Sequence, residues 1–439
     1  MKEQDNQEIF SNQNNKHSKV QYKFSVPNNW EIDPIEKLGK VQGGGTPSTS
    51  APEYWNGDIP WLTPTEVTEN REIEISETER NITEKGYDSS STKLLPENSI
   101  LLTTRATIGN AQINKTPMCT NQGFQNIIPE KNVNTLFLYY QIKQSSDYLN
   151  SLGSGSTFNE ISKSTLKNIK LPKPKSISEQ RKIASVLYNV DQAIQKTEEI
   201  IEQTQRVKKG LMQDLFTEGY FEHDEFEKKE PLNKRPIEWD TKSLNEIAEI
   251  EMGNSPKSKY YNHNGEGLPF YQGNNEFGER YPNTKVWCSQ PVKTANKNDI
   301  LISVRAPVGD LNITTEKCCI GRGLASITTK NIDKNYLFYH LKERKKYLIR
   351  ISAGSTYDSI NSSQLKNLNL KIPPLKEQQK VAEILMKLDN KINSNRKQKH
   401  QLQRIKKGLM QDLLTGKVRT KDKDIEILKE VLEVEEQDN

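Results

Sequence analysis

Apolar residues recur in two long runs at alternating spacings of four and three residues. The first run extends from Ile183 to Leu215 and the second from Val381 to Leu413, and no proline interrupts either. Such a heptad pattern predicts a long helix with one apolar seam that packs against a second helix. Prolines precede both runs, and Ser176 or Ser178 is suited to cap the first helix. At about 1.5 Å per residue, each helix would be a rod of about 50 Å.

The chain also repeats itself at an offset of about 200 residues. Residues 206–215 recur almost unchanged as 404–413, within the two predicted helices. Further upstream, the paired segments are Trp30 with Trp239, 44–47 with 253–256, and 100–109 with 300–309. A repeat of this length indicates a duplicated structural unit, whose loops differ in length while its long helix does not.

Between each tryptophan and its helix, the pattern predicts a globular domain of α+β class. Strand-like runs occupy 99–104, 168–171, 299–304 and 368–372, and short helical runs occupy 136–145 and 336–348. We expect the two long helices to pair as an antiparallel coiled coil with a pseudo-twofold axis; the alternative is that each helix packs only on its own domain. The predicted order is a disordered tail (1–20), a globular domain (21–174), a long helix (175–218), a linker (219–238), a second globular domain (239–373), a second long helix (374–418) and an acidic tail (419–439).

Composition and motifs exclude several classes of protein. No apolar stretch is long enough to cross a membrane, and the polar N-terminal segment has no signal core. The four cysteines form no CxxC pair, which favours the reducing cytoplasm over a disulfide scaffold and gives no metal site. No Walker loop, GxSxG elbow or methyltransferase motif is present, so we expect no catalytic residue. The net charge of +5 is compatible with a polyanionic partner but does not establish one.

The best-matched loops carry side chains that suit nucleic acid. Arg105 and Arg305 follow a strand and precede a glycine turn, where they would hold a phosphate or pair with the fold's own carboxylates. At matched positions the first copy has Gln122 and the second Arg322, and glutamine reads adenine whereas arginine reads guanine. The candidate DNA-binding residues are Thr46, Thr63, Arg105, Gln122, Ser255, Lys257, Gln272, Asn274, Arg305 and Arg322.

A second set of candidates lies inside the long helices. A mid-helix glycine costs about 1 kcal/mol relative to alanine, so a glycine in both copies indicates close helix packing or the approach of a partner. The two lysines before each glycine would form a solvated face or a docking site. The candidate docking residues are Lys208, Lys209, Gly210, Lys406, Lys407 and Gly408.

Taken together, these motifs resemble the specificity subunit of type I restriction–modification systems. The resemblance covers residues 21 to 418 and is carried by the tryptophan starts, the Gly-Gly-Thr-Pro-like loops, the Arg-Ala-x-x-Gly turns and the duplicated Lys-Lys-Gly-Leu-Met-Gln-Asp-Leu helices. It implies that each globular domain is a target recognition domain that reads half of a split site in double-stranded DNA, with the helices as a ruler for the gap. It also implies two modification subunits, which bring S-adenosylmethionine, and restriction subunits, which use ATP and Mg²⁺. This chain itself would hold no cofactor.

Two other functions compete with this interpretation. A coiled-coil scaffold or adaptor without a DNA role would show no salt-dependent DNA binding, whereas recognition of DNA demands a steep salt dependence. A nuclease or methyltransferase acting as a single chain is disfavoured because the cofactor and metal motifs are missing.

Overall fold

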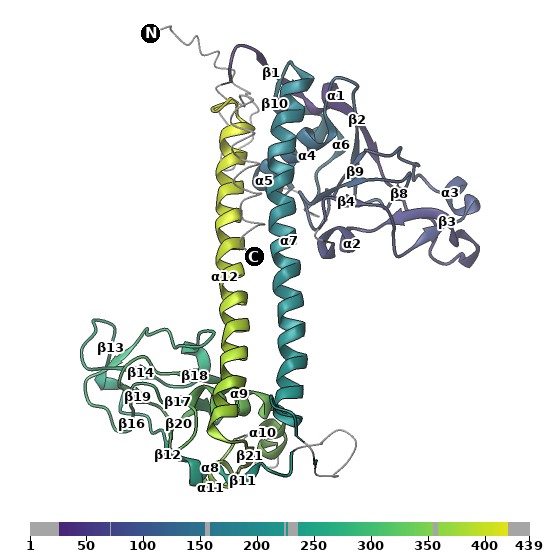
Figure 1. Ribbon diagram of the computed structural model, residues 1–439. Helices are drawn as coiled ribbons and strands as arrows, with labels where there is room; N and C mark the ends of the chain where they lie inside the picture. The colour runs from purple at the N-terminus through teal and green to yellow at the C-terminus, as the bar shows by residue number, and fades with distance from the viewer. Residues whose placement is uncertain are drawn as a thin grey trace. The chain divides into compact units, whose positions relative to one another are not determined.

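The computed structural model describes residues 26–70, 72–153, 159–223, 225–226, 236–353 and 359–419. The expected disordered tail, the acidic tail beyond Arg419 and part of the predicted linker lie outside these ranges. The chain divides into two compact units, Met1–Thr197 with Gln398–Asn439 and Glu198–Lys397, which we call unit 1 and unit 2. Each unit combines small sheets with helices, so the predicted α+β class is confirmed, and Figure 1 shows the two long helices, α7 and α12.

Unit 1 is built on three small sheets. A five-stranded sheet has the order β2-β9-β6-β7-β4, a three-stranded sheet the order β5-β3-β8, and β1 pairs with β10. The strands are β1 Trp30–Pro34, β2 Gly39–Gly43, β3 Trp55–Leu62, β4 Glu74–Ile75, β5 Asn81–Ile82, β6 Ile100–Leu102, β7 Ala111–Asn114, β8 Cys119–Thr120, β9 Gln125–Pro129 and β10 Lys170–Pro174. The helices are α1 Ile35–Leu38, η1 Pro52–Tyr54, α2 Pro64–Glu69, α3 Glu84–Asp88, α4 Thr135–Gln144, α5 Ser146–Gly153, α6 Lys163–Asn168 and the start of α7 Ile177–Thr217.

Unit 2 repeats this plan. Its sheets have the orders β12-β20-β17-β18, β13-β15-β14-β19-β16 and β11-β21. The strands are β11 Asp240–Ser243, β12 Ala248–Met252, β13 Tyr261–Asn262, β14 Leu268–Tyr271, β15 Trp287–Cys288, β16 Thr294–Ala295, β17 Ile300–Ser303, β18 Leu311–Ile313, β19 Cys318–Ile320, β20 Leu324–Thr329 and β21 Asn369–Ile372. The helices are α8 Leu244–Ile247, η2 Ser258–Tyr260, η3 Asn274–Glu276, α9 Lys334–Glu343, α10 Lys345–Ser352, α11 Ser362–Lys366 and α12 Leu375–Leu413.

The prediction of one helix over 336–348 was wrong. The structure has α9 and α10, separated at Arg344, as unit 1 has α4 and α5 separated at Ser145. The second segment turns toward the loop after β17, where a Cβ on Gly309 would lie 3.1 Å from Cγ of Lys345 and 3.6 Å from Cδ1 of Leu348. Local propensity contains no signal for this break, because packing against another part of the chain produces it.

Each unit contains the beginning of one long helix and the end of the other. In unit 1, Ile183 and Leu187 near the start of α7 share a buried cluster with Leu413 at the end of α12. In unit 2, Leu215 at the end of α7 shares a cluster with Val381 near the start of α12. The apolar seams predicted from the heptads are therefore buried at the ends of the helices, within the cores of the two units. No helix in the described ranges is long and apolar enough to cross a membrane.

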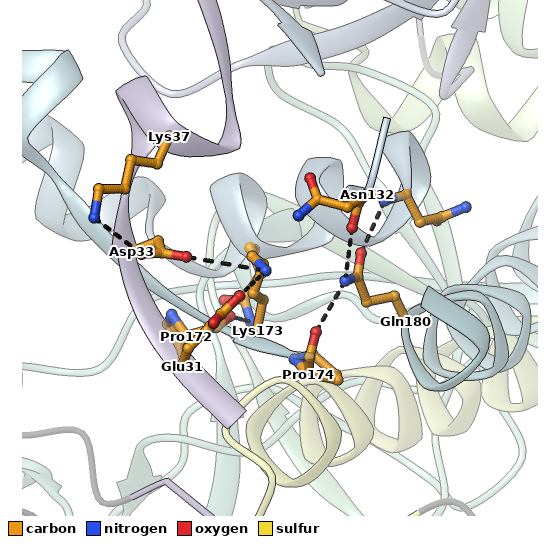
Figure 2. A network of polar contacts seen from close by, with 10 residues as sticks. Glu31, Asp33, Lys37, Asn132, Pro172, Lys173, Pro174 and Gln180 are labelled. Carbon is orange, nitrogen blue, oxygen red and sulfur yellow. Dashed lines mark hydrogen bonds and ion pairs between the residues drawn. The ribbon is translucent and has the colours of Figure 1, made fainter. Parts of the chain in front are cut away.

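A buried glutamine fastens the first turn of each long helix to its globular domain. The side-chain oxygen of Gln180 accepts a hydrogen bond from the backbone N–H of Asn134 (2.8 Å), and its amide donates to the carbonyls of Asn132 (3.2 Å) and Pro174 (2.9 Å). Figure 2 shows this amide between the two carbonyls, near the ion pairs that Lys173 makes with Glu31 and Asp33.

Gln378 has the same role in unit 2. Its oxygen accepts from the N–H of Asp333 (2.8 Å), and its amide donates to the carbonyl of Pro373 (2.8 Å). In both copies the glutamine satisfies backbone groups at the edge of the globular domain, and an unpaired buried backbone group there would cost about 1–3 kcal/mol. Gln180 and Gln378 stand at matched positions of the two copies, so this glutamine has a structural function at both helix starts.

Further along the helices, each unit contains a partly buried triad of lysine, aspartate and tyrosine. In unit 2, Lys208 forms an ion pair with Asp389, and the hydroxyl of Tyr339 donates to the same carboxylate (2.6 Å). The triad of unit 1 occupies equivalent positions of the repeat and consists of Lys406, Asp191 and Tyr140, whose hydroxyl donates to Asp191 (2.7 Å). Burial, first of all, raises the pKa of both tyrosines, and the neighbouring aspartate raises it further. Each triad thus ties together α7, α12 and one short helix of its domain.

We predict that Asp389→Asn destabilises unit 2 by about 2 kcal/mol. Removal of one partner leaves the Lys208 ammonium, only 8% exposed, without its carboxylate; loss of a fully buried pair costs about 3–5 kcal/mol, and the 25% exposure of the Asp389 side chain reduces this figure. Urea unfolding followed by circular dichroism gives the measurement. Glu383→Gln, which removes an exposed pair with Lys387 on the same helix, is the control and should leave unfolding unchanged. Equal unfolding of both variants would contradict a stabilising role for the triad.

Candidate nucleic-acid interface

Four loops meet at one rim of each globular domain. In unit 1 they are residues 44–48 after β2, 63–66 after β3, 105–109 after β6 and 121–123 after β8. In unit 2 they are residues 253–257, 272–275, 305–309 and 321–323, which follow the equivalent strands. We call these two sets the rim of unit 1 and the rim of unit 2. The loops that carry the sequence-predicted residues are the ones that form the rims.

Backbone hydrogen bonds hold the loops of the unit 1 rim together. The N–H of Gly45 donates to the carbonyl of Thr120 (2.9 Å), the N–H of Asn121 to Leu62 (3.1 Å), and the N–H of Thr104 to Gly123 (2.8 Å). At Gly44 the loops approach so closely that a Cβ would lie 1.9 Å from the carbonyl oxygen of Asn121. This is the physical reason for a glycine in the Gly-Gly-Thr-Pro loop.

The rim of unit 2 has the same connections. The N–H of Gly321 donates to the carbonyl of Tyr271 (2.8 Å), the N–H of Gly323 to Gln272 (3.2 Å), and the N–H of Val304 to Gly323 (2.9 Å). The turn with Arg305 ends at Gly309, whose φ of +87° is one that glycine adopts readily; the equivalent Gly109 has a φ of +86°. Both rims are therefore rigid frames of backbone on which side chains can vary.

The side chains on the two frames differ at matched positions. In unit 1 the hydroxyl of Thr46 donates to the side-chain oxygen of Gln122, which is exposed. In unit 2 the equivalent hydroxyl, Ser255, contacts Gln272 (3.0 Å) and accepts from the backbone N–H of Arg322 (3.2 Å), so the guanidinium of Arg322 stays exposed. One rim therefore presents an amide and the other a cation at the same place.

The remaining predicted DNA-binding residues fall into two groups. Arg105, Arg305 and Lys257 are exposed and form no ion pair with the described residues, so their charges face solvent. Thr63 and Asn274 already have partners within their units. The Thr63 hydroxyl donates to Glu66 (2.6 Å) and caps α2, and the Asn274 amide donates to Asp310 (2.7 Å). These two side chains shape the rims and have fewer groups left for a ligand.

The predicted docking residues are also divided by the structure. Lys208 and Lys406 both belong to the triads, and Lys208 is buried, so the interpretation of the lysine pair as a solvated face was wrong for Lys208. Lys209 and Lys407 are exposed. A Cβ on Gly210 or Gly408 would meet no described atom within 4 Å, so close packing within the chain does not explain these glycines. The open surface beside each of them includes an exposed apolar side chain, Val207 (53% exposed) in unit 2 and Ile405 (48%) in unit 1.

Sequence reasoning missed a group of cations in unit 2. Lys209, Arg280, Lys334, Lys342, Arg344, Lys345 and Lys346 line a cavity between the last turns of α7, the start of α12 and α9–α10. The run Lys342–Lys346 was a signal for it, because the first copy has Lys143, Gln144, Ser145, Ser146 and Asp147 there. Arg280 gave no such signal, since it lies in a loop where the two copies differ.

The described residues include no cluster of histidine, cysteine, aspartate and glutamate that could hold a metal ion. The four cysteines are free and buried, and burial raises the pKa of Cys119 to about 11 and that of Cys318 and Cys319 to about 12. A thiol with such a pKa stays protonated and unreactive at neutral pH, as in a cysteine that packs in a protein core.

Two rims with the same backbone frame and different side chains define a protein built from two copies of one domain. The family of the type I restriction modification DNA specificity domain matches residues 27–206 and again residues 236–404. The chain therefore belongs to this family and contains two such domains.

Relatives with assigned names match large parts of the chain. The type I restriction enzyme MjaIX specificity subunit of Methanocaldococcus jannaschii is 33% identical over 418 residues, which are 90% of this chain and 95% of that protein. The putative MjaX specificity subunit of the same organism is 39% identical over 290 residues, 65% of this chain and 68% of that protein. The crystal structure of the type I restriction–modification S subunit from M. genitalium has the same fold, with a TM-score of 0.59, 18% identity and coverage of 90% of this chain and 98% of that one.

Proposed function

We propose that this chain is the DNA specificity subunit of a type I restriction–modification complex and that each rim reads one half of a split DNA site. The observation that carries the proposal is the pair of rims, alike in backbone and different in side chains. Gln122 and Arg322 stand at matched positions, and their groups suit different bases. If both domains served one structural purpose, the same backbone frame would give no physical reason for different side chains at these positions.

We further propose that α7 and α12 pair in antiparallel fashion and set the gap between the half-sites. This is supported within each unit, where the end of one helix packs on the start of the other. Two equivalent recognition domains on antiparallel helices would suit a split DNA site. The halves of such a site lie on either side of a spacer whose sequence is not recognised. A half-site spacing follows from such geometry, because a rigid rod fixes the distance between the contacts.

The chain would serve this function without a catalytic residue or cofactor of its own. Modification subunits would bring S-adenosylmethionine, and restriction subunits would bring ATP and Mg²⁺. The open helix faces around Gly210 and Gly408 suit the docking of one modification subunit each, because both combine an exposed apolar side chain with a glycine that admits close approach. A cytoplasmic location stays a prediction of the same proposal.

Expression of the chain with its modification subunit tests the proposed function directly. Adenine methylation mapped across a genome should be confined to a sequence of two short parts separated by a gap of fixed length. DNA binding by the complex should weaken steeply as salt rises, since phosphate contacts release counterions. Methylation without such a split sequence, or the absence of salt-dependent binding, would favour a scaffold without a DNA role.

Exchange of one rim residue should change one half of the site only. Gln122→Arg is expected to change the preferred base in the half-site read by unit 1, because a guanidinium replaces the side-chain amide. The difference in binding free energy between the right and the wrong base should change by about 1–3 kcal/mol. Arg322→Gln is the matched variant and should alter the other half. Methylation mapping of both variants gives the result, and equal changes in both halves would show that the loop assignment is wrong.

A bulky residue at an open helix glycine should block docking. Gly210→Trp is expected to reduce binding of the modification subunit at least tenfold, with the chain itself still folded, as a Cβ at this position has open space within 4 Å. Gly210→Ala is the control; it should leave binding intact and stabilise the helix by about 1 kcal/mol. Light scattering after size-exclusion chromatography counts the bound subunits, and full assembly of the tryptophan variant would refute docking at this face.

A further inference from the structure

Unit 2 contains a basic cavity of about 1550 Å³. Its walls are the last turns of α7, the α12 segment 386–396, the loop 278–283, and parts of α9 and α10. Nine lysine and arginine side chains line it, against three carboxylates, Glu279, Glu343 and Asp389. The cavity therefore concentrates positive charge well beyond the average of the chain.

Only part of this charge is neutralised within the protein. Four of the nine cations have a carboxylate within ion-pair distance, in the pairs Lys208 with Asp389, Arg344 with Glu343, Lys345 with Asp310, and Arg396 with Glu279. The other five form no ion pair with any residue in the described ranges: Lys209, Arg280, Lys334, Lys342 and Lys346. Loss of hydration lowers the pKa of Lys342, and the neighbouring charge of Lys208 lowers it further. An anion in the cavity would relieve this mutual repulsion.

Arg280 is held in a fixed orientation at this cavity. Its guanidinium donates to the hydroxyl of Tyr339 (2.9 Å) and to the side-chain oxygen of Asn335 (2.6 Å). It also lies over the ring of Phe338, 4.9 Å from the centroid. A guanidinium has five N–H donors, so donors remain for a ligand, and its planar fork matches the oxygens of a phosphate.

One carboxylate contacts both a residue of the unit 2 rim and a residue of the cavity. Asp310 accepts from the Asn274 amide of the rim with one carboxylate oxygen and pairs with Lys345 of the cavity through the other. A nucleic-acid strand whose bases meet the rim could thus place neighbouring phosphates in the cavity.

Unit 1 lacks part of the corresponding charge. Ile73 occupies the place of Arg280, since the carbonyls of both residues accept from the equivalent strand residues Ile113 and Ile313. The first copy keeps Lys407 and Lys143 at the positions of Lys209 and Lys342. At four other positions it has neutral or acidic residues: Thr135 for Lys334, Leu136 for Asn335, Ser146 for Lys345 and Asp147 for Lys346. The duplication therefore kept the frame in both copies and placed this cluster in one.

We propose that the basic cavity is a phosphate clamp for the DNA backbone and that only the second half of the protein uses it. The proposal rests on the proposed function, which supplies the DNA. It implies that the two half-sites are bound through different contacts. Unit 2 binds the DNA backbone beside its half-site, whereas unit 1 depends more on its rim. Because backbone contacts position a protein and carry no base information, the clamp would raise affinity without changing the sequence that is read.

The test uses the complex of the chain with its modification subunit and a duplex that contains the methylated site. The double variant Arg280→Gln/Lys346→Gln should make the slope of log affinity against log salt shallower by about 1.8, as each phosphate contact contributes about 0.9. Ethylation of phosphates beside the half-site of unit 2 should interfere with binding of the wild-type complex and no longer with the variant. The methylated sequence should stay the same.

The control removes equal charge from unit 2 outside the cavity. Lys297→Gln/Lys317→Gln, at two exposed lysines, should leave the slope and the interference pattern unchanged. If Arg280→Gln disturbs folding, Lys334→Gln/Lys346→Gln replaces it, because neither lysine has an ion-pair partner among the described residues.

The outcomes separate the two proposals. A wild-type complex that does not bind a split site would refute the proposed function itself. Binding of the split site with the same slope for cavity and control variants would overturn the clamp alone.

Discussion

The buried glutamine at the start of each long helix is the contact on which the arrangement within each unit depends. A primary amide in a protein interior is tolerated only where its groups are paired, and any shift that breaks its hydrogen bonds leaves polar atoms without water. Gln180 bridges the loop before α4 and the end of β10, and Gln378 does the same before α9 and after β21. The helix therefore cannot rotate or slide relative to its sheets at low cost. Because the rim loops follow strands of the same domain, their place relative to the first turn of the helix is fixed as well.

The two halves show how a common frame can carry different chemistry. Backbone hydrogen bonds between loops, close approach at Gly44 and Gly253, and turns at Gly109 and Gly309 recur in both units. None of them depends on the side chains that point outward, so Gln122 and Arg322 can differ without a change in the frame. The hydrogen bonds between side chains within the rims also differ. Thr46 of the unit 1 rim contacts Gln122 in the loop after β8, whereas Ser255 of the unit 2 rim contacts Gln272 after β14.

Lysine side chains in the same helices have unlike functions because their surroundings differ. Lys208 and Lys406 are enclosed by an aspartate and a tyrosine and hold helices together, whereas the adjacent Lys209 and Lys407 face solvent. In unit 2 further cations gather around the triad, and the hydroxyl of Tyr339 accepts from Arg280 while it donates to Asp389. The structural triad and the proposed phosphate clamp therefore share an atom, so that the same tyrosine orients the arginine and anchors α12.

The sequence alone determined the duplication, the α+β class, the long helices and the loops that form the rims. These features depend on local periodicity and on self-similarity, which survive in one chain without its contacts. It did not reveal the break at Arg344, the ion pair of one lysine of each pair or the basic cavity, and it left open whether Gly210 marks close helix packing. Each of these depends on which side chains from distant segments come together: Lys208 with Asp389, Lys345 with the turn at Gly309, Arg280 with Tyr339. Burial and pairing of charge are properties of the folded surroundings, so only the tertiary structure could decide them.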